Sequence, residues 1–493
     1  KVRELLQTGT LTALQELLRR TPEGVLEMMH IKGLGPKKIH TLWKELSIDS
    51  IEALAAACQS NRIAQQKGFG DKTQQKILEA ISFRQEATGK YLYASIEAFA
   101  LAFTERLRSA FPACRLELTG DFRRQLDIID HLDWVTTIPA ADLQAELAAL
   151  ELPQLSASTE ELVYEAQGAL PLRFHLTTEA AIGTIWFTRT CAPSFLQAFR
   201  SRTGFTGSEA YASEESLFAA YGLPPVPPPL REEGSVLQRN DAYERLLQPS
   251  EVKGLIHAHS TWSDGGHTLE AMAEALIEQG FEYLVISDHS KAAFYANGLD
   301  EARIRQQHRE IDALNAKLAP FKIYKSIECD ILGDGSLDYD DATLASFDLV
   351  IASIHSNLDM DEEKAMHRLL QAIANPYVTI LGHMTGRLLL RRKGYPVNHK
   401  KIIEACSRNE VAIEINANPN RLDIGWQWVD AALQQGVLLS VNPDAHTIDE
   451  YANIKYGVLV GQKGGLTAER NLSSFSRVQF DAFLQERRRL RGI

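Results

Sequence analysis

Six histidines and three acidic residues stand behind short apolar runs in the C-terminal half of the chain. The first two, His257 and His259, follow Leu255-Ile256 and are separated by one residue. Histidines at alternate positions of a strand end project to the same side and form a natural chelate. The others are Asp264, His289, Glu328, His355, His383, Asp444 and His446. Because imidazoles and carboxylates without thiolates favour Zn²⁺, Mn²⁺ or Fe²⁺ over Ca²⁺, the pattern predicts a metal centre.

Nine nitrogen and oxygen ligands are too many for one ion and suit two or three divalent metals. Such a cluster lowers the pKa of a bound water and clamps phosphate oxygens, so the predicted nucleophile is a metal-bound water held by the same nine residues. A lone histidine behind a strand is usually hydrogen-bonded or solvent-facing, but six of the chain's 14 histidines share this placement. Arg387, Arg421 and Lys291 are candidate phosphate contacts, and each could equally be a surface cation.

The elements that must position these ligands are short apolar runs alternating with amphipathic helical patterns from Gly254 onward. The runs include residues 255–256, 283–286, 349–353, 378–381, 411–415 and 437–441. This rhythm is typical of a parallel α/β barrel or a doubly wound sheet. In both folds the C-terminal ends of the strands open onto one face, so ligands far apart in sequence are expected to converge there.

Residues 1–90 predict short helices joined by two turns with a common pattern. Glycines in such turns let the backbone approach a phosphate, and the helix that follows offers free N–H groups. The turns carry Gly33, Gly35, Lys37 and Lys38, then Gly68, Gly70 and Lys72. They resemble the helix-hairpin-helix module, which contacts the nucleic-acid backbone without reading sequence. The alternative is a pair of ordinary helix-capping turns.

Composition limits the class of protein. The chain has 493 residues, 45% hydrophobic and 24% charged, which suits a soluble globular protein of about three domains. Five scattered cysteines without CxxC spacing suit a reducing cytoplasm. Net charge is −12, but residues 1–90 hold 14 Lys and Arg against 10 Asp and Glu. The N-terminal region is therefore basic and the rest of the chain is acidic. We expect a cytoplasmic monomer that lacks part of its natural N-terminus and binds DNA rather than a membrane.

The remaining pattern divides the chain further. Residues 91–221 predict a mixed α/β region, with strands near 115–118 and 132–137. The proline-rich run 222–229 predicts a polyproline-type linker over 222–250, and residues 251–493 form the metal-binding domain. The predicted fold is therefore multidomain α/β.

The metal-binding pattern resembles the polymerase and histidinol phosphatase (PHP) domain in the form attached to bacterial family X DNA polymerases. The resemblance includes HxH, SDG, DH, a strand-end Glu, SxH, GHxTGR and DxH, together with Glu414–Pro419. It implies a distorted (βα)7 barrel with three metals. One metal would be held by His257, His259, Glu328 and Asp444; the second by Glu328, His355 and His383; the third by Asp264, His289 and His446.

The resemblance extends upstream to the nucleotidyltransferase palm of family X. Its signature places Gly-Ser and two arginines ahead of an Asp-x-Asp pair, whose acids hold two Mg²⁺ ions on the triphosphate. Here Asp121 replaces the serine, His131 replaces the first aspartate and only Asp133 survives. The third carboxylate, ten residues before Gly183, is Arg173. An imidazole and a guanidinium in place of two carboxylates predict a degenerate polymerase site in a retained palm.

Three further readings stand beside a DNA 3′–5′ exonuclease or 3′-end processing enzyme of DNA repair. One is a small-molecule phosphatase of histidinol-phosphatase type, against which the doubled glycine turns argue. Another is a DNA-binding scaffold without turnover. The last is a still-active family X polymerase, despite His131 and Arg173.

Overall fold

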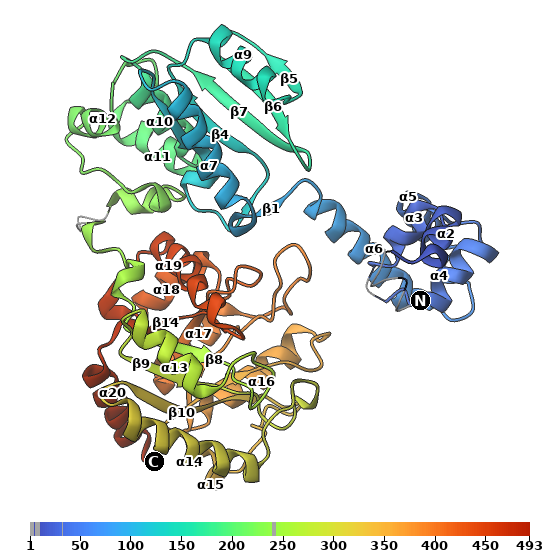
Figure 1. Cartoon of the computed structure of the whole chain (residues 1–493), viewed down its shortest axis with the longest axis vertical. Helices are drawn as coiled ribbons and strands as arrows, with labels where there is room; N and C mark the ends of the chain where they lie inside the picture. The colour runs from blue at the N-terminus through green and yellow to red at the C-terminus, as the bar shows by residue number, and fades with distance from the viewer. Residues whose placement is uncertain (1–3, 5–9, 32, 239–242) are drawn as a thin grey trace. The chain divides into compact units, whose positions relative to one another are not determined.

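The computed structural model describes residues 4, 10–31, 33–238 and 243–493. It divides into two compact units, Lys1–Gly89 and Lys90–Ile493 (Figure 1). Among the described residues, no helix is both long and apolar enough to cross a membrane.

The first unit is helical around a small core that includes Met28, Leu42, Leu54 and Ile77. Its elements are α2 (Thr12–Arg20), α3 (Glu23–Met28), α4 (Pro36–His40), the π-helix η1 (Thr41–Glu45), α5 (Ile51–Gln59) and α6 (Gly70–Ala87). The predicted turns directly precede α4 and α6. Pro36 opens α4, where its missing N–H costs nothing because the first helical N–H groups have no partner within the helix.

The second unit begins with a five-stranded sheet in the order β2-β4-β7-β6-β5, where β4 and β7 are parallel. Trp134 and Phe174 stack in its core with ring centroids 5.1 Å apart. The elements are β1 (Tyr91–Leu92), α7 (Tyr93–Ala110), β2 (Leu116–Thr119), α8 (Gly120–Arg123), β3 (Ile128–Ile129), β4 (Leu132–Thr136), α9 (Ala140–Ala149), β5 (Gln154–Ala157), β6 (Glu161–Ala166), β7 (Leu170–Leu176), α10 (Ile182–Thr190), α11 (Pro193–Thr203) and α12 (Glu214–Ala220).

Residues 222–250 differ from the expected extended linker. The described part forms short 3₁₀ turns, η2 (Pro228–Leu230), η3 (Gly234–Gln238), η4 (Tyr243–Arg245) and η5 (Pro249–Glu251). Val226, Leu230 and Val236 are buried against Phe187 and Phe199. The prolines do exclude long helices, but the apolar residues between them supply enough surface to pack on α10 and α11.

Seven parallel strands then form a nearly closed barrel in the order β14-β13-β12-β11-β10-β9-β8. A parallel bridge between Ala258 and Ala445 joins the two ends, and His259 N–H donates to Ala445 O at 2.8 Å. The strands are β8 (Gly254–Ala258), β9 (Tyr283–Ile286), β10 (Lys322–Asp330), β11 (Leu349–Ser353), β12 (Val378–Leu381), β13 (Ala412–Asn416) and β14 (Leu439–Asn442). The prediction of a seven-stranded parallel barrel is confirmed.

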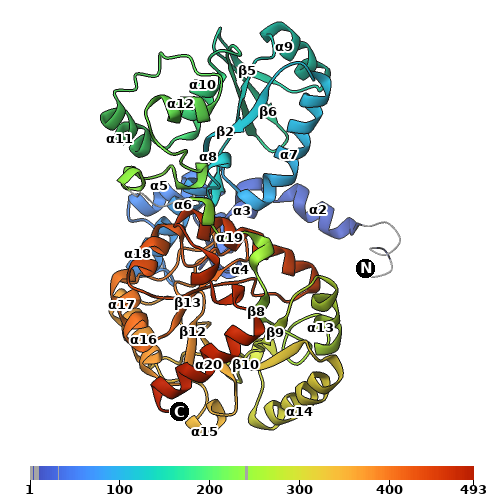
Figure 2. The ribbon, with the colours of Figure 1, turned by 90° about the vertical axis from the view of Figure 1, so that its left-hand side faces the viewer.

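Helices surround the barrel, and the last one lies across it (Figure 2). Phe480 and Leu484 of that helix pack with inward-facing residues such as Tyr283 and Tyr324. The elements are α13 (Leu269–Glu278), η6 (Phe294–Ala296), α14 (Glu301–Leu318), α15 (Asp341–Leu344), α16 (Glu362–Ala374), α17 (His399–Asn409), η7 (Trp426–Trp428), α18 (Val429–Gln434), η8 (Ile448–Asn453), α19 (Ile454–Lys463), η9 (Ala468–Arg470), η10 (Leu472–Ser474) and α20 (Arg477–Arg491). Tyr283 begins β9, so α20 covers the N-terminal strand ends and leaves the C-terminal ends for the site.

Candidate metal centre

Glu328 lies at the centre of the predicted ligands, near the end of the long strand β10. Its Oε1 is 2.9 Å from His383 Nε2 and 3.1 Å from His355 Nε2. Its Oε2 is 3.0 Å from His289 Nδ1. The Glu328 side chain is fully buried. Each of these imidazoles reaches it from the end of a different strand.

The His-x-His pair reaches Glu328 through an irregular strand end. The pairing of β8 with β9 shifts register between Ile256 and Ala258, and His257 has φ +66°. His257 Nε2 is 3.3 Å and His259 Nε2 is 3.7 Å from the Glu328 carboxylate. A left-handed backbone at a non-glycine residue is strained and clusters at functional sites, where the surroundings hold it in place. Both imidazoles therefore converge as predicted, although by a bulge rather than by simple alternation.

Asp444, beyond the end of β14, is the second buried acid of the cluster and also has a positive φ, +53°. Its Oδ1 is 3.1 Å from His259 Nε2 and 3.5 Å from His257 Nε2. Arg421 Nε stands 3.6 Å from the other oxygen.

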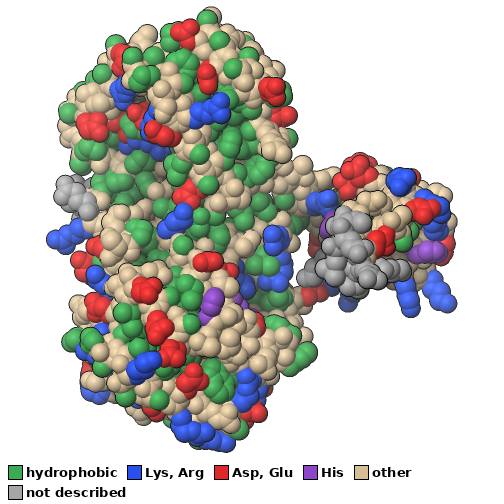
Figure 3. Space-filling view, in the orientation of Figure 1, with side chains coloured by type: hydrophobic (Ala, Val, Ile, Leu, Met, Phe, Trp, Pro, Cys, Tyr) green, Lys and Arg blue, Asp and Glu red, His purple; other side chains and the backbone are tan. Residues whose placement is uncertain are grey.

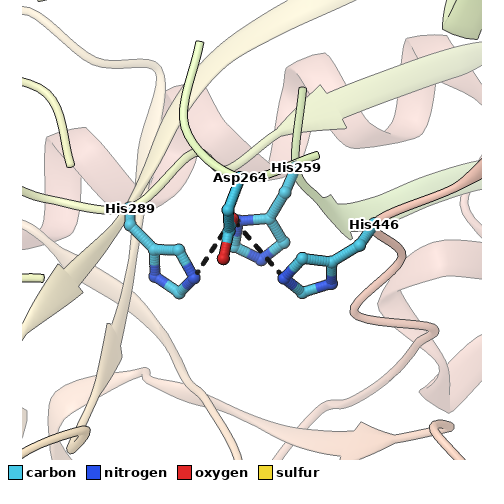
Figure 4. Close-up of side chains that lie close together, drawn as sticks. All are labelled: His259, Asp264, His289 and His446. Atoms are coloured by element: carbon cyan, nitrogen blue, oxygen red, sulfur yellow. Dashed lines mark ion pairs between the residues drawn. The ribbon is translucent and has the colours of Figure 1, made fainter. Parts of the chain in front are cut away.

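Asp264 gathers an outer group of three histidines (Figure 4). Its Oδ1 is 3.6 Å from His446 Nε2, 3.7 Å from His289 Nε2 and 4.0 Å from His259 Nδ1. The Asp264 and His446 side chains keep about a third of their surface exposed, 34% and 35%. This group is therefore the open side of the cluster.

The structure brings all nine predicted ligands together. Ligand atoms that lie within 4.8 Å of one another define three groups: His259, Asp264, His289 and His446; His257, His259 and Glu328; and His289, Glu328 and His355. His383 and Asp444 join through Glu328 and His259. These groups differ from the three ligand sets that the family resemblance implies. His259 also belongs to the outer group around Asp264, and His289 also belongs to the group of Glu328 and His355.

The ionised acids of the cluster favour positive charge on the groups beside them. Burial opposes ionisation of Glu328, but the charges of His355 and His257 hold its pKa well below the usual range. Burial also disfavours the imidazolium of His355, yet Glu328 and Asp330 raise its pKa to about 10. His259 is the exception: its burial, beside His289, lowers its pKa to about 3, the neutral form that a metal ligand requires.

Several buried ligand atoms lack a hydrogen-bond partner among the described residues. They are His257 Nε2, His259 Nδ1, His289 Nδ1 and Glu328 Oε2. Buried polar atoms without partners are costly, and metal coordination satisfies them. The donor set of imidazoles and carboxylates therefore fits divalent metals.

Glu414, on β13, is a functional residue that the sequence reasoning did not assign a role. Its Oε1 accepts from His257 Nδ1 at 2.5 Å, and its Oε2 accepts from the His383 backbone N–H at 2.8 Å. Asn416 and Asn442 donate to it as well. The carboxylate therefore orients one metal ligand and fixes the backbone of another. Its place behind the run 411–413 was the signal that could have identified it.

Asp288, next to His289, contacts the loop 260–263 and, among the described residues, forms no hydrogen bond with a histidine side chain. Its carboxylate accepts from Ser260 N and Ser263 N at 2.8 and 3.2 Å, and from the Gln307 side chain at 2.6 Å. These bonds fix the segment that carries Asp264.

The three candidate phosphate contacts have different surroundings. Arg387 donates to the carbonyls of Arg421 and Leu422 and reaches Asp127 of the palm region at 3.3 Å. Lys291 Nζ pairs with Glu301 Oε1 at 2.6 Å. Arg421, beside Asp444, is the one of the three that contacts a metal ligand.

Three of the four glycines in the turns of the first unit have a left-handed backbone. Gly33, Gly68 and Gly70 have φ of +92°, +91° and +68°, a region open to glycine. Lys38 Nζ donates to Gly33 O at 3.1 Å and lies 5.7 Å from the Phe69 ring, which brings the two turns together. Lys37 and Lys72 are exposed. Lys and Arg side chains project from the surface of this unit in Figure 3.

The palm region holds a second, smaller cluster around Asp133. Its two oxygens are 2.8 Å from His131 Nε2 and 3.2 Å from His175 Nε2. Burial opposes its ionisation, but hydrogen bonds from both histidines hold its pKa below the usual range. Arg173 of β7 lies opposite Asp133 of β4 in the parallel strand register, so both side chains lie on the same face of the sheet. Asp121 accepts from Arg124 instead of facing this cluster.

Comparisons with known proteins agree with the families expected for the N-terminal and C-terminal regions of the chain. Residues 25–82 match the family model of the SAM-like helix-hairpin-helix tandem, and residues 256–418 match the PHP domain. The fold and the ligand cluster therefore define a PHP-domain protein with a helix-hairpin-helix tandem.

One relative covers nearly the whole chain. It is the DNA polymerase/3′-5′ exonuclease PolX of Bacillus subtilis, 34% identical over 98% of this chain and 88% of the relative. The chain therefore belongs to the PolX family of family X DNA polymerases with a C-terminal PHP domain. More distant relatives match about half of the chain: a probable phosphatase of Thermoanaerobacter, 24% identical over 45% of this chain and 91% of the relative, and one of Caldanaerobacter subterraneus, 25% identical over 48% and 92%.

Proposed function

We propose that this enzyme hydrolyses phosphodiester bonds at the 3′ ends of DNA, as a 3′–5′ exonuclease or 3′-end processing enzyme in DNA repair. The observation that carries the proposal is the convergence of the nine predicted ligands, Glu328 among them, in one cluster of a chain that also carries a helix-hairpin-helix tandem. The Bacillus relative, named for the same activity, supports the substrate class.

The cluster has the parts that this reaction needs. Divalent metals held there would supply Lewis acidity toward phosphate oxygens and would lower the pKa of water. Glu414 keeps His257 oriented through its 2.5 Å hydrogen bond, and Asp288 fixes the segment that carries Asp264. Arg421, one-fifth exposed at the edge of the cluster, offers a guanidinium to a phosphate oxygen.

The test is cleavage of a 3′-labelled single strand with Mn²⁺. A His257→Ala, His259→Ala variant is expected to lose at least about 1000-fold in rate, because both imidazoles lie beside the Glu328 carboxylate and His259 belongs to two of the three ligand groups. His367→Ala is the matched control, since His367 is exposed on α16. If the double variant cleaves as fast as the parent, the barrel is not the nuclease.

We propose further that the palm no longer polymerises. In support, both oxygens of Asp133 face histidines, and Arg173 occupies the position of a carboxylate. Primer extension with Mg²⁺ or Mn²⁺ by the His257→Ala, His259→Ala variant tests this without interference from degradation. Extension of the primer would contradict it.

A second candidate function is hydrolysis of small phosphomonoesters, which the probable phosphatases among the relatives favour. The two candidates predict different competition. If DNA is the substrate, single-stranded DNA inhibits cleavage of a chromogenic phosphomonoester; if small molecules are, it does not. The metal identity (Mn²⁺, Zn²⁺ or Fe²⁺), the monomeric state, the cytoplasmic location and the predicted domain boundaries stay predictions.

A further inference from the structure

Two adjacent aromatic side chains are exposed beside the metal centre. Phe294 is 84% exposed and Tyr295 is 64% exposed, and Phe294 is the most exposed large hydrophobic side chain among the described residues. Their ring centroids are 6.0 Å apart and their planes are inclined by 79°. Exposed apolar groups of this size raise the free energy of the free protein, so a pair of them at a site indicates a ligand that covers them.

The segment that carries this pair starts and ends at a metal ligand. Leu299 N–H donates to His289 O at 2.8 Å, and Ser290 N–H donates to Glu328 O at 3.1 Å. The loop therefore leaves the cluster at His289, turns at η6 and returns to the same place. Burial first, and then the carboxylates of Asp330, Glu328 and Asp264, raise the pKa of Tyr295 to about 12, in agreement with a loop tip near the acids of the cluster.

Hydrogen bonds hold the loop in one shape. Ala292 N–H donates to Asp338 Oδ2 at 2.6 Å, and Arg303 Nη1 donates to Asn297 O at 2.6 Å. A Cβ on Gly298 would lie 1.9 Å from Ser290 O, so the two arms of the loop touch at this glycine. The aromatic pair is therefore presented by a fixed loop, which lowers the entropy lost when a ligand binds.

The same loop is tied to the segment that carries the exposed ligand Asp264. The Asn297 side-chain amide donates to Trp262 O at 3.3 Å, two residues before Asp264. The aromatic pair thus borders the open side of the cluster, where a substrate phosphate must enter. An exposed aromatic ring next to a phosphate-binding metal centre complements a nucleotide, which has a flat base next to its phosphate.

We propose that Phe294, supported by Tyr295, stacks on a base at the 3′ end of single-stranded DNA and so positions the adjacent phosphodiester at the metal cluster. This inference rests on the proposed function and specifies the form of DNA: a single-stranded end with unpaired bases. Stacking on an aromatic side chain is sequence-tolerant, because every base has a π face. The enzyme is therefore expected to accept all four bases and to disfavour ends that lack them.

The test compares oligonucleotides with normal and abasic 3′ ends, cleaved by the parent, Phe294→Ala and Phe294→Trp proteins. The parent is expected to prefer the normal end about tenfold or more in kcat/KM. Phe294→Ala is expected to lose most of this preference through KM, and Phe294→Trp to retain it. Because Phe294 is 84% exposed, its replacement is not expected to affect folding. Phe99→Ala, at an exposed phenylalanine on α7, is the control.

The outcomes separate the two proposals. If the parent cleaves no 3′ end, the proposed function fails. If it cleaves and Phe294→Ala keeps the full preference for normal ends, the function stands and the stacking role is wrong. Binding of a single strand with 2-aminopurine at its 3′ end, whose fluorescence is quenched by stacking, gives a readout without turnover. Equal quenching by the parent and Phe294→Ala would also overturn the stacking role.

Discussion

The barrel and the palm each arrange histidines around a buried acid on a β-strand, yet only the barrel has the features of a metal centre. Around Glu328, several ligand atoms lack a hydrogen-bond partner among the described residues, and further carboxylates stand close by. Around Asp133, each oxygen faces one histidine at 2.8 and 3.2 Å. The palm cluster has one buried atom without a hydrogen-bond partner among the described residues, His175 Nδ1, against several in the barrel. Proximity of histidine and acid alone therefore does not define a metal site, whereas a set of buried atoms without hydrogen-bond partners favours one.

The difference lies in the charge that the neighbours supply. In the palm, Arg173 is the neighbour of Asp133 on the adjacent parallel strand and supplies positive charge there. In the barrel, Asp444 and Asp264 add negative charge to that of Glu328. Asp130 and Glu161 also lie beside the palm histidines, and Arg173 offsets part of the negative charge of this cluster.

The largest effect is expected at Glu328, because its carboxylate faces more ligands than any other acid described. Glu328→Gln should reduce DNA cleavage by at least about 1000-fold and lower the bound metal, as measured by initial rates and elemental analysis of the purified protein. Asp312→Asn, at an exposed acid that pairs with Lys325, should change neither. A fully metallated, active Glu328→Gln protein would contradict the central role of this residue.

A smaller effect is expected at Glu414, which orients His257 without belonging to a ligand group. Glu414→Gln should weaken metal binding about 10- to 100-fold, as such supporting residues usually do. The activity should recover at higher Mn²⁺ concentration, measured as a shift of the Mn²⁺ titration midpoint. The exposed Glu404→Gln on α17 is the control. A loss that no Mn²⁺ concentration restores would mean that Glu414 acts on the substrate instead.

Local pattern predicted the barrel and the convergence of the nine candidate ligands because strand ends and polar residues coincide in the sequence. His289 lies shortly after the end of β9, and His383 lies shortly after the end of β12. The apolar run before each histidine was the local signal. The bulge at His257 had none, since its φ of +66° depends on the pairing of β8 with β9 and on the closing bridge to Ala445. Register between distant strands is not encoded in either strand alone.

Long-range contacts explain the other differences. The segment 222–250 carries a proline run typical of a linker, but Val226 and Leu230 find a complementary apolar surface on the helices before it. The role of Arg387 also depends on tertiary structure, because Asp127, its acidic partner, lies 260 positions earlier. Composition alone cannot reveal such partners.

A single substitution would give the palm a pair of acids like those of the barrel. His131→Asp would place a second carboxylate beside Asp133, where the imidazole now donates at 2.8 Å. Like charges at this distance should destabilise the palm by about 1–3 kcal/mol, and millimolar Mg²⁺ should restore part of that loss. Thermal unfolding with and without Mg²⁺ measures both. His367→Asp, at an exposed position, should show neither change. Destabilisation that Mg²⁺ leaves untouched would show that the palm no longer has the geometry to bind a metal.

The smallest effect is the pH dependence of the same contact. A hydrogen bond to Asp133 raises the pKa of His131, and those from His131 and His175 lower that of Asp133, although its burial opposes this. A raised histidine pKa contributes stability that is complete below the unfolded value of about 6.5 and is lost as pH rises through the folded pKa. A lowered aspartate pKa contributes stability above about 3.9 that is lost in acid. His131→Gln should therefore cost about 1 kcal/mol near pH 5–6 and progressively less at alkaline pH. Unfolding of parent and variant across this range measures the difference, and a constant difference at every pH would show that His131 stabilises the palm as a neutral donor.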